Sequence, residues 1–336
     1  MALIDQRHRP FRDLRISVTD RCNFRCAYCM PADVFGEAYR FLPKPQLLTF
    51  EEIARLARVF AGLGAQKIRL TGGEPLIRKE LETLIAMLGA IPGIDDIALT
   101  TNGYFLPQKA QVLREAGLQR VTVSLDSLDG EVFRLLNGDR ADVEQVLAGI
   151  GAARRVGFAP IKINAVIKRG VNDRSVVGLA RFCRDRGYIA RFIEYMDVGT
   201  RNGWRLDDVV PAREIVETID AALPLEPVAP NYPGEVATRY RYRDGGGEIG
   251  VIASVTQPFC GGCTRLRLSP EGQMFTCLFG TRGVDLRGPL RDGVSDEALA
   301  AIARGVWQRR DDRYSEIRTS HTAPRDPKVE MYHIGG

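Results

Sequence analysis

Apolar and polar residues alternate along six short segments of the first two thirds of the chain, and a stretch of helical periodicity follows each one. A period of two is typical of strands, and a spacing of three or four is typical of helices. The predicted strands cover residues 13–19, 66–71, 96–101, 120–125, 160–167 and 190–196. The predicted helices cover residues 49–61, 78–90, 107–116, 129–156 with a break around 137–138, 173–186 and 211–222. Repeated strand–helix units predict a parallel sheet, and six units are two short of a closed eightfold barrel. We therefore expect an α/β fold that forms an open, partial (β/α)6 barrel.

Each predicted strand has one apolar face and one polar face, whereas a strand buried on both faces would be apolar on both. The polar faces carry Arg15, Ser17, Thr19, Lys67, Arg69, Thr71, Thr100, Asn102, Ser124, Asp126, Lys162 and Asn164. We expect these side chains to surround a polar lumen. Because its basic residues outnumber its acids, the lumen predicts an anionic substrate.

The pattern changes after residue 222. Residues 224–234 form a proline-rich linker without a recognisable signature. Short alternating runs at 238–243, 248–254, 264–268 and 273–278 then predict an antiparallel extension that covers the open side of the barrel. The sequence thus predicts a barrel over residues 1–222 and an extension over residues 223–336.

Composition says little about the fold but more about the partners and the cellular compartment. The chain has 336 residues, of which 45% are hydrophobic and 26% charged, with a net charge of +5. These values are typical of an ordinary globular protein. We expect no nucleic-acid partner. We also expect no association with a membrane, because no long apolar run or apolar leader occurs. Seven cysteines without a secretion signal predict thiolates in a reducing compartment, hence the cytoplasm.

The first group of cysteines follows the first predicted strand. Cys22, Cys26 and Cys29 have the spacing Cys-x3-Cys-x2-Cys. Three thiolates can bind three corners of an iron–sulfur cubane and leave the fourth iron open, whereas a structural zinc site needs four protein ligands. The neighbouring residues offer no fourth thiol or imidazole, so the spacing favours an iron–sulfur cluster over a zinc knuckle.

This spacing, with Tyr28 beside the last cysteine, resembles that of the radical S-adenosylmethionine superfamily. In that superfamily the open iron chelates the amino and carboxylate groups of the methionine moiety. The turn at residues 72–75 (Gly-Gly-Glu-Pro) resembles the superfamily's segment that binds the amino group. The resemblance implies that Tyr28, Gly73, Ser124 and Met196 line an S-adenosylmethionine site.

A second group of cysteines lies in the extension. Cys260, Cys263 and Cys277 again provide three thiols without a fourth nearby, which predicts a second cluster. A structural zinc site completed by His321 or His333 remains an alternative. Cys183 differs, because it lies on the apolar face of a predicted helix and is expected to pack in the core.

The two cysteine groups, the Arg265-Leu266-Arg267 segment and the final Gly335-Gly336 together resemble the GTP 3′,8-cyclase family. These radical S-adenosylmethionine enzymes perform the first step of molybdenum cofactor biosynthesis, and the resemblance extends over nearly the whole chain. It implies a lyase with two [4Fe–4S] clusters and S-adenosylmethionine. The first cluster would generate a 5′-deoxyadenosyl radical that takes the 3′ hydrogen of GTP, after which the ribose carbon attacks C8 of guanine.

The same resemblance implies the substrate contacts and the partners. The implied GTP contacts are Arg15, Arg69, Thr100, Lys162, Arg265, Leu266 and Arg267. The open iron of the second cluster would bind the guanine, and the tail with Gly335 and Gly336 would enter the site. An external electron donor and cyclic pyranopterin monophosphate synthase, which takes the product, are the implied partners; a homodimer is left open.

Two other functions compete with this interpretation. A two-cluster radical S-adenosylmethionine enzyme acting on a peptide would carry a longer cysteine-rich tail and a peptide-docking region. A non-enzymatic iron–sulfur redox protein would not need a polar lumen along six strands. The chain has no Gly-x4-Gly-Lys-Ser/Thr motif, which argues against nucleotide hydrolysis by a P-loop.

Overall fold

The computed structural model describes residues 3–318 and 328–335 of the chain, and the predicted alternation of strands and helices is present. The strands of the predicted barrel are β1 (Asp13–Ser17), β2 (Lys67–Thr71), β3 (Asp96–Thr101), β4 (Arg120–Ser124), β5 (Lys162–Ile167) and β6 (Ile189–Glu194). The strands of the extension are β7 (Leu225–Val228), β8 (Thr238–Tyr242), β9 (Glu248–Ile252), β10 (Arg265–Leu268), β11 (Gln273–Phe275) and β12 (Val284–Asp285).

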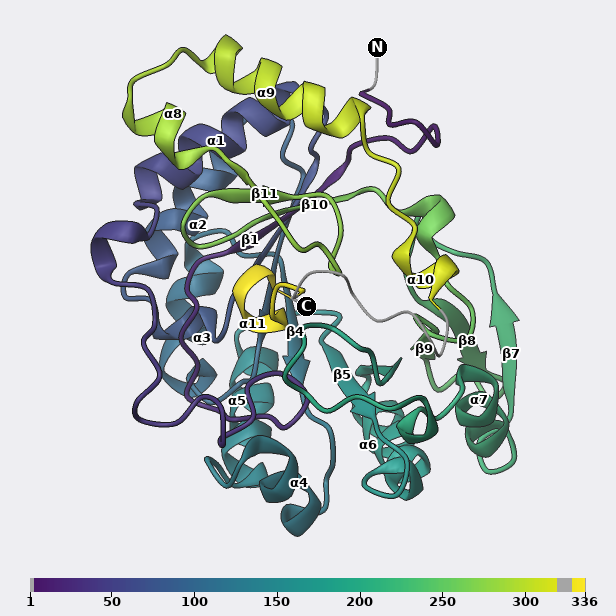
Figure 1. Cartoon of the computed structure of the whole chain (residues 1–336). Coiled ribbons are helices and arrows are strands. Elements are labelled where there is room, and N and C mark those ends of the chain that lie inside the picture. Colours follow the sequence, from purple (N-terminus) through teal and green to yellow (C-terminus); the bar gives the residue numbers. More distant parts are fainter. Residues whose placement is uncertain (1–2, 319–327, 336) are drawn as a thin grey trace.

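All twelve strands belong to one sheet, in the spatial order β12-β11-β10-β1-β2-β3-β4-β5-β6-β9-β8-β7. Figure 1 shows β11 and β10 toward one edge of this sheet and β8 and β7 at the other. The eight strands from β10 to β9 in this order run parallel to their neighbours. Within the described residues, the end strands β12 and β7 do not pair with each other, so the sheet is open. This confirms the predicted partial barrel.

The helices of the barrel begin and end within a few residues of their predicted bounds. They are α1 (Phe50–Gly62), α2 (Leu81–Gly89), α3 (Leu106–Glu115), α4 (Gly130–Asn137), α5 (Val143–Arg155), α6 (Val176–Arg186) and α7 (Ala212–Asp220). The break predicted around residues 137–138 separates α4 from α5. Gly138 ends α4 with φ of 73°, a left-handed conformation that glycine adopts without steric cost.

The two faces of the sheet differ as the alternation predicted. Leu14, Ile16, Ile68, Leu70 and Ile163 are 1% exposed or less and pack in the main core with residues of the helices. Their neighbours in the strands, such as Arg15 and Arg69, are only partly buried and point to the opposite face. Cys183 is completely buried in the same core, as expected.

The extension differs in part from its prediction as an antiparallel layer. The pairs β7–β8, β8–β9, β10–β11 and β11–β12 are antiparallel, but β9 lies parallel beside β6 and β10 lies parallel beside β1. The extension therefore lengthens the parallel sheet at both edges. Beyond the last predicted strand it also contains helices that were not predicted: α8 (Arg287–Arg291), α9 (Asp296–Gln308), α10 (Tyr314–Ile317) and α11 (Met331–Ile334). Among the described residues, no helix is long and apolar enough to span a membrane.

A buried carboxylate connects the barrel to the extension. Glu194, the last residue of β6, is inaccessible to solvent. Its Oε1 accepts hydrogen bonds from the backbone N–H of Ala212 (2.7 Å) and the hydroxyl of Thr256, and its Oε2 accepts them from the backbone N–H groups of Val255 (2.7 Å) and Thr256 (2.9 Å). One side chain thus joins β6 to the start of α7 and to the segment after β9.

We expect Glu194→Gln to destabilise the protein by about 1–3 kcal/mol, because an amide NH2 would face buried N–H donors and leave them without an acceptor. The measurement is the midpoint of thermal unfolding under anaerobic conditions, followed by circular dichroism. Glu214→Gln is the matched control, since Glu214 forms an exposed ion pair with Arg169 and such pairs contribute at most about 1 kcal/mol. Equal midpoints for both variants would contradict this assignment.

Candidate active site

The polar face of the parallel sheet encloses a basic cavity. Its positively charged lining residues are Arg9, Arg15, Lys67, Arg69, Arg120, Arg191, Arg265, Arg267 and Arg310. Among residues 3–318 and 328–335, carboxylates line it only at Asp13, Glu235 and Asp312. Such an excess of cations on concave walls attracts anionic ligands, as the sequence predicted for the lumen.

Burial and mutual repulsion lower the pKa values of several cations in and beside this cavity. Burial lowers the pKa of Arg15 well below its usual value, and the neighbouring Arg267, Arg265 and Arg69 lower it further. Burial, followed by Arg265, lowers the pKa of Arg267 to about 9. Lys162 has its pKa lowered to about 7 by burial and by Arg191, Arg120 and Arg69. Crowded, desolvated cations of this kind are stabilised when an anion binds between them.

Hydrogen bonds between neighbouring strands hold these side chains in place. The Arg69 Nη1 donates to Thr100 Oγ1 (2.9 Å) and to Thr122 Oγ1 (3.2 Å). The Lys67 Nζ lies 3.1 Å from the Tyr232 hydroxyl and 4.9 Å from the centroid of its ring. Tyr232 belongs to the linker after β7, which sequence reasoning left without a role, and this linker forms part of the cavity wall.

The first group of cysteines lies in the loop after β1, at the carboxyl ends of the parallel strands. The backbone N–H groups of Arg25 and Ala27 donate to the carbonyls of Asn137 (2.9 Å) and Leu136 (3.2 Å) at the end of α4. The Arg25 guanidinium also donates to the Cys22 carbonyl (2.8 Å). The loop is thereby fixed against α4 instead of relying on a ligand alone.

The glycine turn after β2 packs against the same loop. The Gly73 N–H donates to the Thr19 carbonyl (2.9 Å) and the Glu74 N–H to the Arg21 carbonyl (2.8 Å). A Cβ atom on Gly73 would overlap the Arg21 carbonyl oxygen, so this close approach requires glycine. The turn therefore positions the backbone directly before Cys22.

The Glu74 carboxylate forms hydrogen bonds with other residues of the protein. It accepts hydrogen bonds from Thr101 Oγ1 (2.7 Å) and from the backbone N–H groups of Asn102 (2.7 Å) and Leu76 (3.0 Å). Burial raises the pKa of Glu74 to about 7, although these hydrogen bonds oppose the shift. Asn102 in turn donates to Asn23 Oδ1 (2.8 Å), next to Cys22. Glu74 thus connects the turn to the end of β3.

The remaining candidates for S-adenosylmethionine contact lie at the same ends of the strands. Tyr28 donates its hydroxyl hydrogen to Asp126 Oδ2 (2.8 Å), and Asp126 Oδ1 accepts from the backbone N–H of Val166 (2.8 Å). Ser124 is the partly buried last residue of β4. Met196 follows β6 and lines the basic cavity.

The second group of cysteines lies at the opposite ends of the strands. Cys260 and Cys263 precede β10, whose first residue Arg265 is paired with Asp13, the first residue of the parallel β1. Cys277 follows β11, which returns antiparallel beside β10. All three line the basic cavity. The strand β1 between these two ends is about 13 Å long, from four steps of about 3.3 Å between its five residues.

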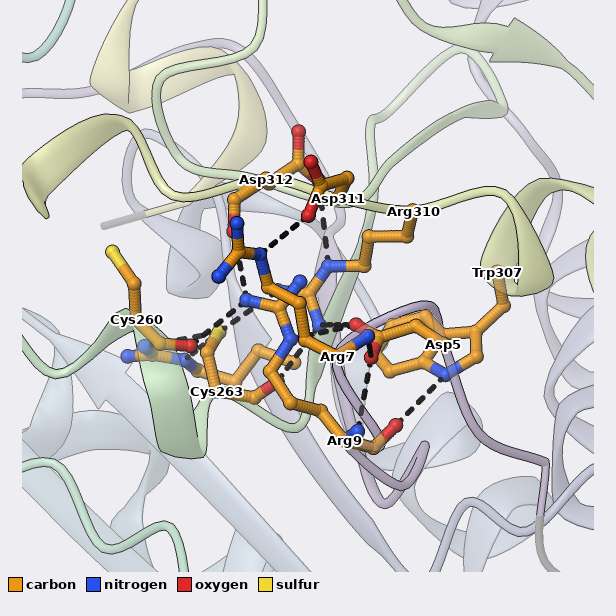
Figure 2. A network of polar contacts seen from close by, with 10 residues as sticks. Asp5, Arg7, Arg9, Cys260, Cys263, Trp307, Arg310, Asp311 and Asp312 are labelled. Carbon is orange, nitrogen blue, oxygen red and sulfur yellow. Dashed lines mark hydrogen bonds and ion pairs between the residues drawn. The ribbon is translucent and has the colours of Figure 1, made fainter. Parts of the chain in front are cut away.

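Arginines surround the sulfur of Cys263 (Figure 2). Arg265 donates to this Sγ from Nε (3.4 Å) and Nη2 (3.2 Å), and Arg310 donates from Nη2 (3.1 Å). Although burial raises the pKa of the Cys263 thiol, Arg265 and Arg310 outweigh it and lower this pKa to about 6. Burial raises the pKa of Cys277 to about 11 and that of Cys22 to about 12.

The donor chemistry of both groups fits iron–sulfur clusters. All six cysteines are free thiols, and each group offers sulfur donors only. Among the described residues, no three His, Cys, Asp or Glu side chains converge closely enough to hold a single metal ion, whereas a four-iron cubane takes its thiolates at separate corners. Of the imidazoles considered for zinc, His333 Nε2 lies 2.8 Å from Glu271 Oε1, and His321 lies outside the described residues.

The C-terminal tail is anchored to the loops that follow β6 and β1, and α11 lies in front of the middle of the sheet in Figure 1. The Lys328 Nζ donates to Asp197 Oδ2 (2.6 Å), one residue after Met196. The Tyr332 hydroxyl lies 2.6 Å from the Tyr39 hydroxyl, in the segment that follows the first cysteines.

The tip of the tail reaches the lumen. The Arg267 guanidinium donates to the carbonyls of Ile334 (3.3 Å) and Gly335. Gly335 has φ of 69°, and a Cβ atom on it would overlap the Thr71 side chain at the end of β2. Gly336 lies outside the described residues.

Some predicted substrate contacts do not line the cavity. Leu266 is 1% exposed and its side chain packs in the main core. Lys162 is near Arg191 and Arg69 electrostatically but is not part of the cavity wall. Conversely, sequence reasoning missed Arg120, Arg191, Tyr232 and Arg310. The alternation in β6 could have indicated Arg191, which lies between the buried Ala190 and Phe192.

Two family comparisons cover most of the chain. Residues 16–183 match the Radical SAM superfamily, and residues 188–316 match Molybdenum Cofactor Synthesis C. The two matches therefore meet near the start of β6.

The solved structures that resemble the chain agree on the fold. Streptococcus suis SuiB bound to the precursor peptide SuiA has a TM-score of 0.62 at 16% identity, covering 92% of this chain and 67% of SuiB. The protein anSMEcpe with bound AdoMet has a TM-score of 0.51 at 16% identity, covering 64% of this chain and 58% of that one. At these identities the likeness shows the fold alone.

Curated relatives match along almost their whole length. A GTP 3′,8-cyclase from Acidothermus cellulolyticus is 55% identical, over 99% of this chain and 98% of the relative. GTP 3′,8-cyclases from Xanthomonas axonopodis pv. citri (50%) and Staphylococcus aureus (48%) also match 99% of this chain and 98% of their own length. With these matches, and with two groups of free cysteines at opposite ends of its parallel strands, the chain belongs to the GTP 3′,8-cyclase family of radical S-adenosylmethionine enzymes in molybdenum cofactor synthesis.

Proposed function

We propose that this chain is a lyase that converts GTP into (8S)-3′,8-cyclo-7,8-dihydroguanosine 5′-triphosphate, with two [4Fe–4S] clusters and S-adenosylmethionine. One observation carries the proposal: a strongly basic lumen, with the second group of cysteines in its wall, lies along parallel strands whose other ends carry the first group. A molecule with an anionic tail and a separate base is suited to such a lumen, because its two ends can be fixed while the ribose between them reacts.

The first cluster would be held by Cys22, Cys26 and Cys29, and the second by Cys260, Cys263 and Cys277. When bound, the first cluster and S-adenosylmethionine supply the radical chemistry that removes the 3′ hydrogen of the ribose. Tyr28, Gly73, Ser124 and Met196 would contact S-adenosylmethionine. Glu74 supports this site as part of the turn that packs against the cysteine loop. Asp126 supports it by accepting a hydrogen bond from the Tyr28 hydroxyl.

The residues of the lumen would bind and orient GTP. Arg15, Arg69, Arg265 and Arg267 offer guanidinium donors suited to phosphate oxygens, and Thr100 holds Arg69 in place. Lys162 would act on the triphosphate by its charge, and Leu266 would contribute only through its main chain, because its side chain is in the core. The second cluster would fix the guanine at its open iron.

The wider assignments also remain proposals. An external electron donor would reduce the first cluster, and cyclic pyranopterin monophosphate synthase would take the product; a homodimer stays open. Residues 1–222 would hold S-adenosylmethionine, and residues 223–336 would bring the second cluster and the tail. The reducing compartment that clustered thiolates need, and with it the cytoplasm, stays a prediction.

The function and the second cluster are tested together by Cys277→Ala. The parent protein, reconstituted anaerobically, is expected to hold about eight irons and to form both 5′-deoxyadenosine and the cyclised nucleotide from GTP, S-adenosylmethionine and a reductant. Cys277→Ala should keep about four irons and lose the cyclised product, while still cleaving some S-adenosylmethionine. Iron analysis and mass spectrometry measure both.

Cys183→Ala is the control, because this cysteine is completely buried on α6 and belongs to neither group, and it should retain all the iron. Stoichiometric zinc in place of iron, or an uncyclised nucleotide with the parent protein, would refute the proposed function.

We expect GTP affinity to fall as the pH rises above about 7, owing to Lys162. Its pKa of about 7 in the free protein must rise when a triphosphate binds, so binding takes up a proton and weakens once the lysine is neutral. The GTP affinity should fall at least about tenfold between pH 7 and pH 9, because binding that takes up one proton weakens by up to about tenfold for each pH unit. Isothermal titration calorimetry in buffers of different ionisation enthalpy measures both the affinity and the proton uptake.

Lys162→Arg is the matched variant, because a guanidinium keeps its charge over this range. It should bind GTP with an affinity nearly independent of pH between pH 7 and pH 8, below the lowered pKa of Arg267. The same pH dependence in Lys162→Arg as in the parent would exclude Lys162 as its source.

The tail is tested by Gly335→Ala. The added methyl would meet Thr71, and the left-handed backbone at Gly335 disfavours alanine, so the tip should leave the lumen and cyclisation should be lost with the iron content unchanged. Gly170→Ala is the control, since Gly170 has φ of 72° with no atom within 4 Å of the added Cβ. Parent activity in Gly335→Ala would show that the tip has no role.

A further inference from the structure

One buried arginine outside both cysteine loops is directed at a cysteine sulfur. Arg310 follows α9, and its side chain is 1% exposed. Its Nη2 donates to Cys263 Sγ (3.1 Å) and its Nη1 to the Cys263 carbonyl (2.8 Å). The sulfur and the backbone of one residue are therefore held by the same guanidinium (Figure 2).

The N-terminal segment fixes this guanidinium. The Asp5 carboxylate is completely buried, and its Oδ2 accepts from Arg310 Nη1 (3.2 Å) and from Arg9 Nε (2.6 Å). The Trp307 ring lies against Arg310, with 4.5 Å between the guanidinium carbon and the ring centroid. Arg310 Nε is 3.3 Å from Asp312 Oδ2. All three nitrogens of Arg310 are thus engaged within the protein.

Arg9 extends the network to the first cysteine of the group. Its Nη1 donates to the carbonyls of Cys260 (2.8 Å) and Asp312 (2.7 Å), and the Trp307 Nε1 donates to the Arg9 carbonyl (3.3 Å). The turn that contains Cys260 and Cys263 is therefore held by hydrogen bonds from residues 5–9 and 307–312 together.

Stability alone gives no good reason for this arrangement. A buried ion-pair network gains little over apolar packing of the same volume, because both charges lose their hydration. Among the described residues, the other arginine at Cys263 Sγ, Arg265, makes side-chain hydrogen bonds only to that sulfur, and its guanidinium lines the cavity proposed for GTP. Arg310 also lines this cavity, but four of its five N–H donors are already used within the protein.

We propose that Arg310, held by Asp5 and Arg9, is a positioning residue that fixes the Cys263 thiolate and raises the reduction potential of the second cluster. Hydrogen bonds to ligand sulfurs and nearby positive charge both favour the reduced, more negative form of an iron–sulfur cluster. The inference rests on the proposed second cluster. It means that the potential of this cluster is set by segments from the two ends of the chain, not by the cysteine loop alone.

The test is Arg310→Gln in the full-length protein with its clusters in place. Asp5 keeps its ion pair with Arg9 in this variant, so no buried carboxylate is left alone. A redox titration followed by electron paramagnetic resonance gives the potential of each cluster, and the signal of the second cluster is the one that Cys277→Ala lacks. We expect the second cluster to become harder to reduce, by roughly tenfold in the ratio of reduced to oxidised cluster at a fixed potential, as for one charge-assisted hydrogen bond. The first cluster should be unchanged.

Arg7→Gln is the matched control, because Arg7 belongs to the same segment and pairs with Asp311 but contacts no cysteine. It should leave both potentials as in the parent. A parent with about eight irons and an unchanged second potential in Arg310→Gln overturns this inference alone, whereas a parent with about four irons overturns the second cluster as well.

Should Arg310→Gln not hold the second cluster, Arg310→Met, which is apolar and similar in length, is measured instead. A lower second potential there supports the proposal. Loss of the second cluster in both variants, with the first cluster intact, would mean that Arg310 is needed for assembly and would overturn a role in setting the potential.

Discussion

The structure depends on parallel strands that have only one apolar face. The outer side chains of β1 to β6 are completely buried against the helices, which fixes the curvature and order of the strands. Several of the inner side chains are cations and would repel one another if they were simply covered, as the lowered pKa values of Arg15, Arg69 and Arg267 indicate. An interior of this kind is stable as a space that an anion enters, not as a second core.

The sequence predicted the site correctly where polar side chains recur at every second residue along a strand. Alternation alone placed Arg15, Lys67, Arg69, Thr100 and Asn164 in the cavity wall. It could not give the direction of β9 and β10, because side chains alternate in the same way in parallel and antiparallel strands. The spacing of the cysteines predicted the ligand groups, and that prediction is still to be tested by iron analysis.

Contacts between distant parts of the chain could not be predicted from any local pattern. Arg310 and Cys263 are 47 residues apart, and Arg9 and Cys260 are 251 residues apart. Arg310 follows a helix that the short alternating runs of the extension did not indicate. Tyr232 lies in a proline-rich segment whose sequence resembles an ordinary linker, yet its ring stacks on two cations of the barrel, Lys67 and Arg12.

The parallel pairing of β10 with β1 and of β9 with β6 has a consequence for how the chain can be divided. The two family matches meet near residue 188, but the outer edges of the barrel strands are covered by strands that come much later in the sequence. A fragment ending at residue 222 would expose rows of unpaired backbone groups along both β1 and β6, and such edges pair with any strand they meet, including those of other copies. Synthesis on the ribosome produces that fragment for a time, so the edges at β1 and β6 stay unpaired until β10 and β9 have been made.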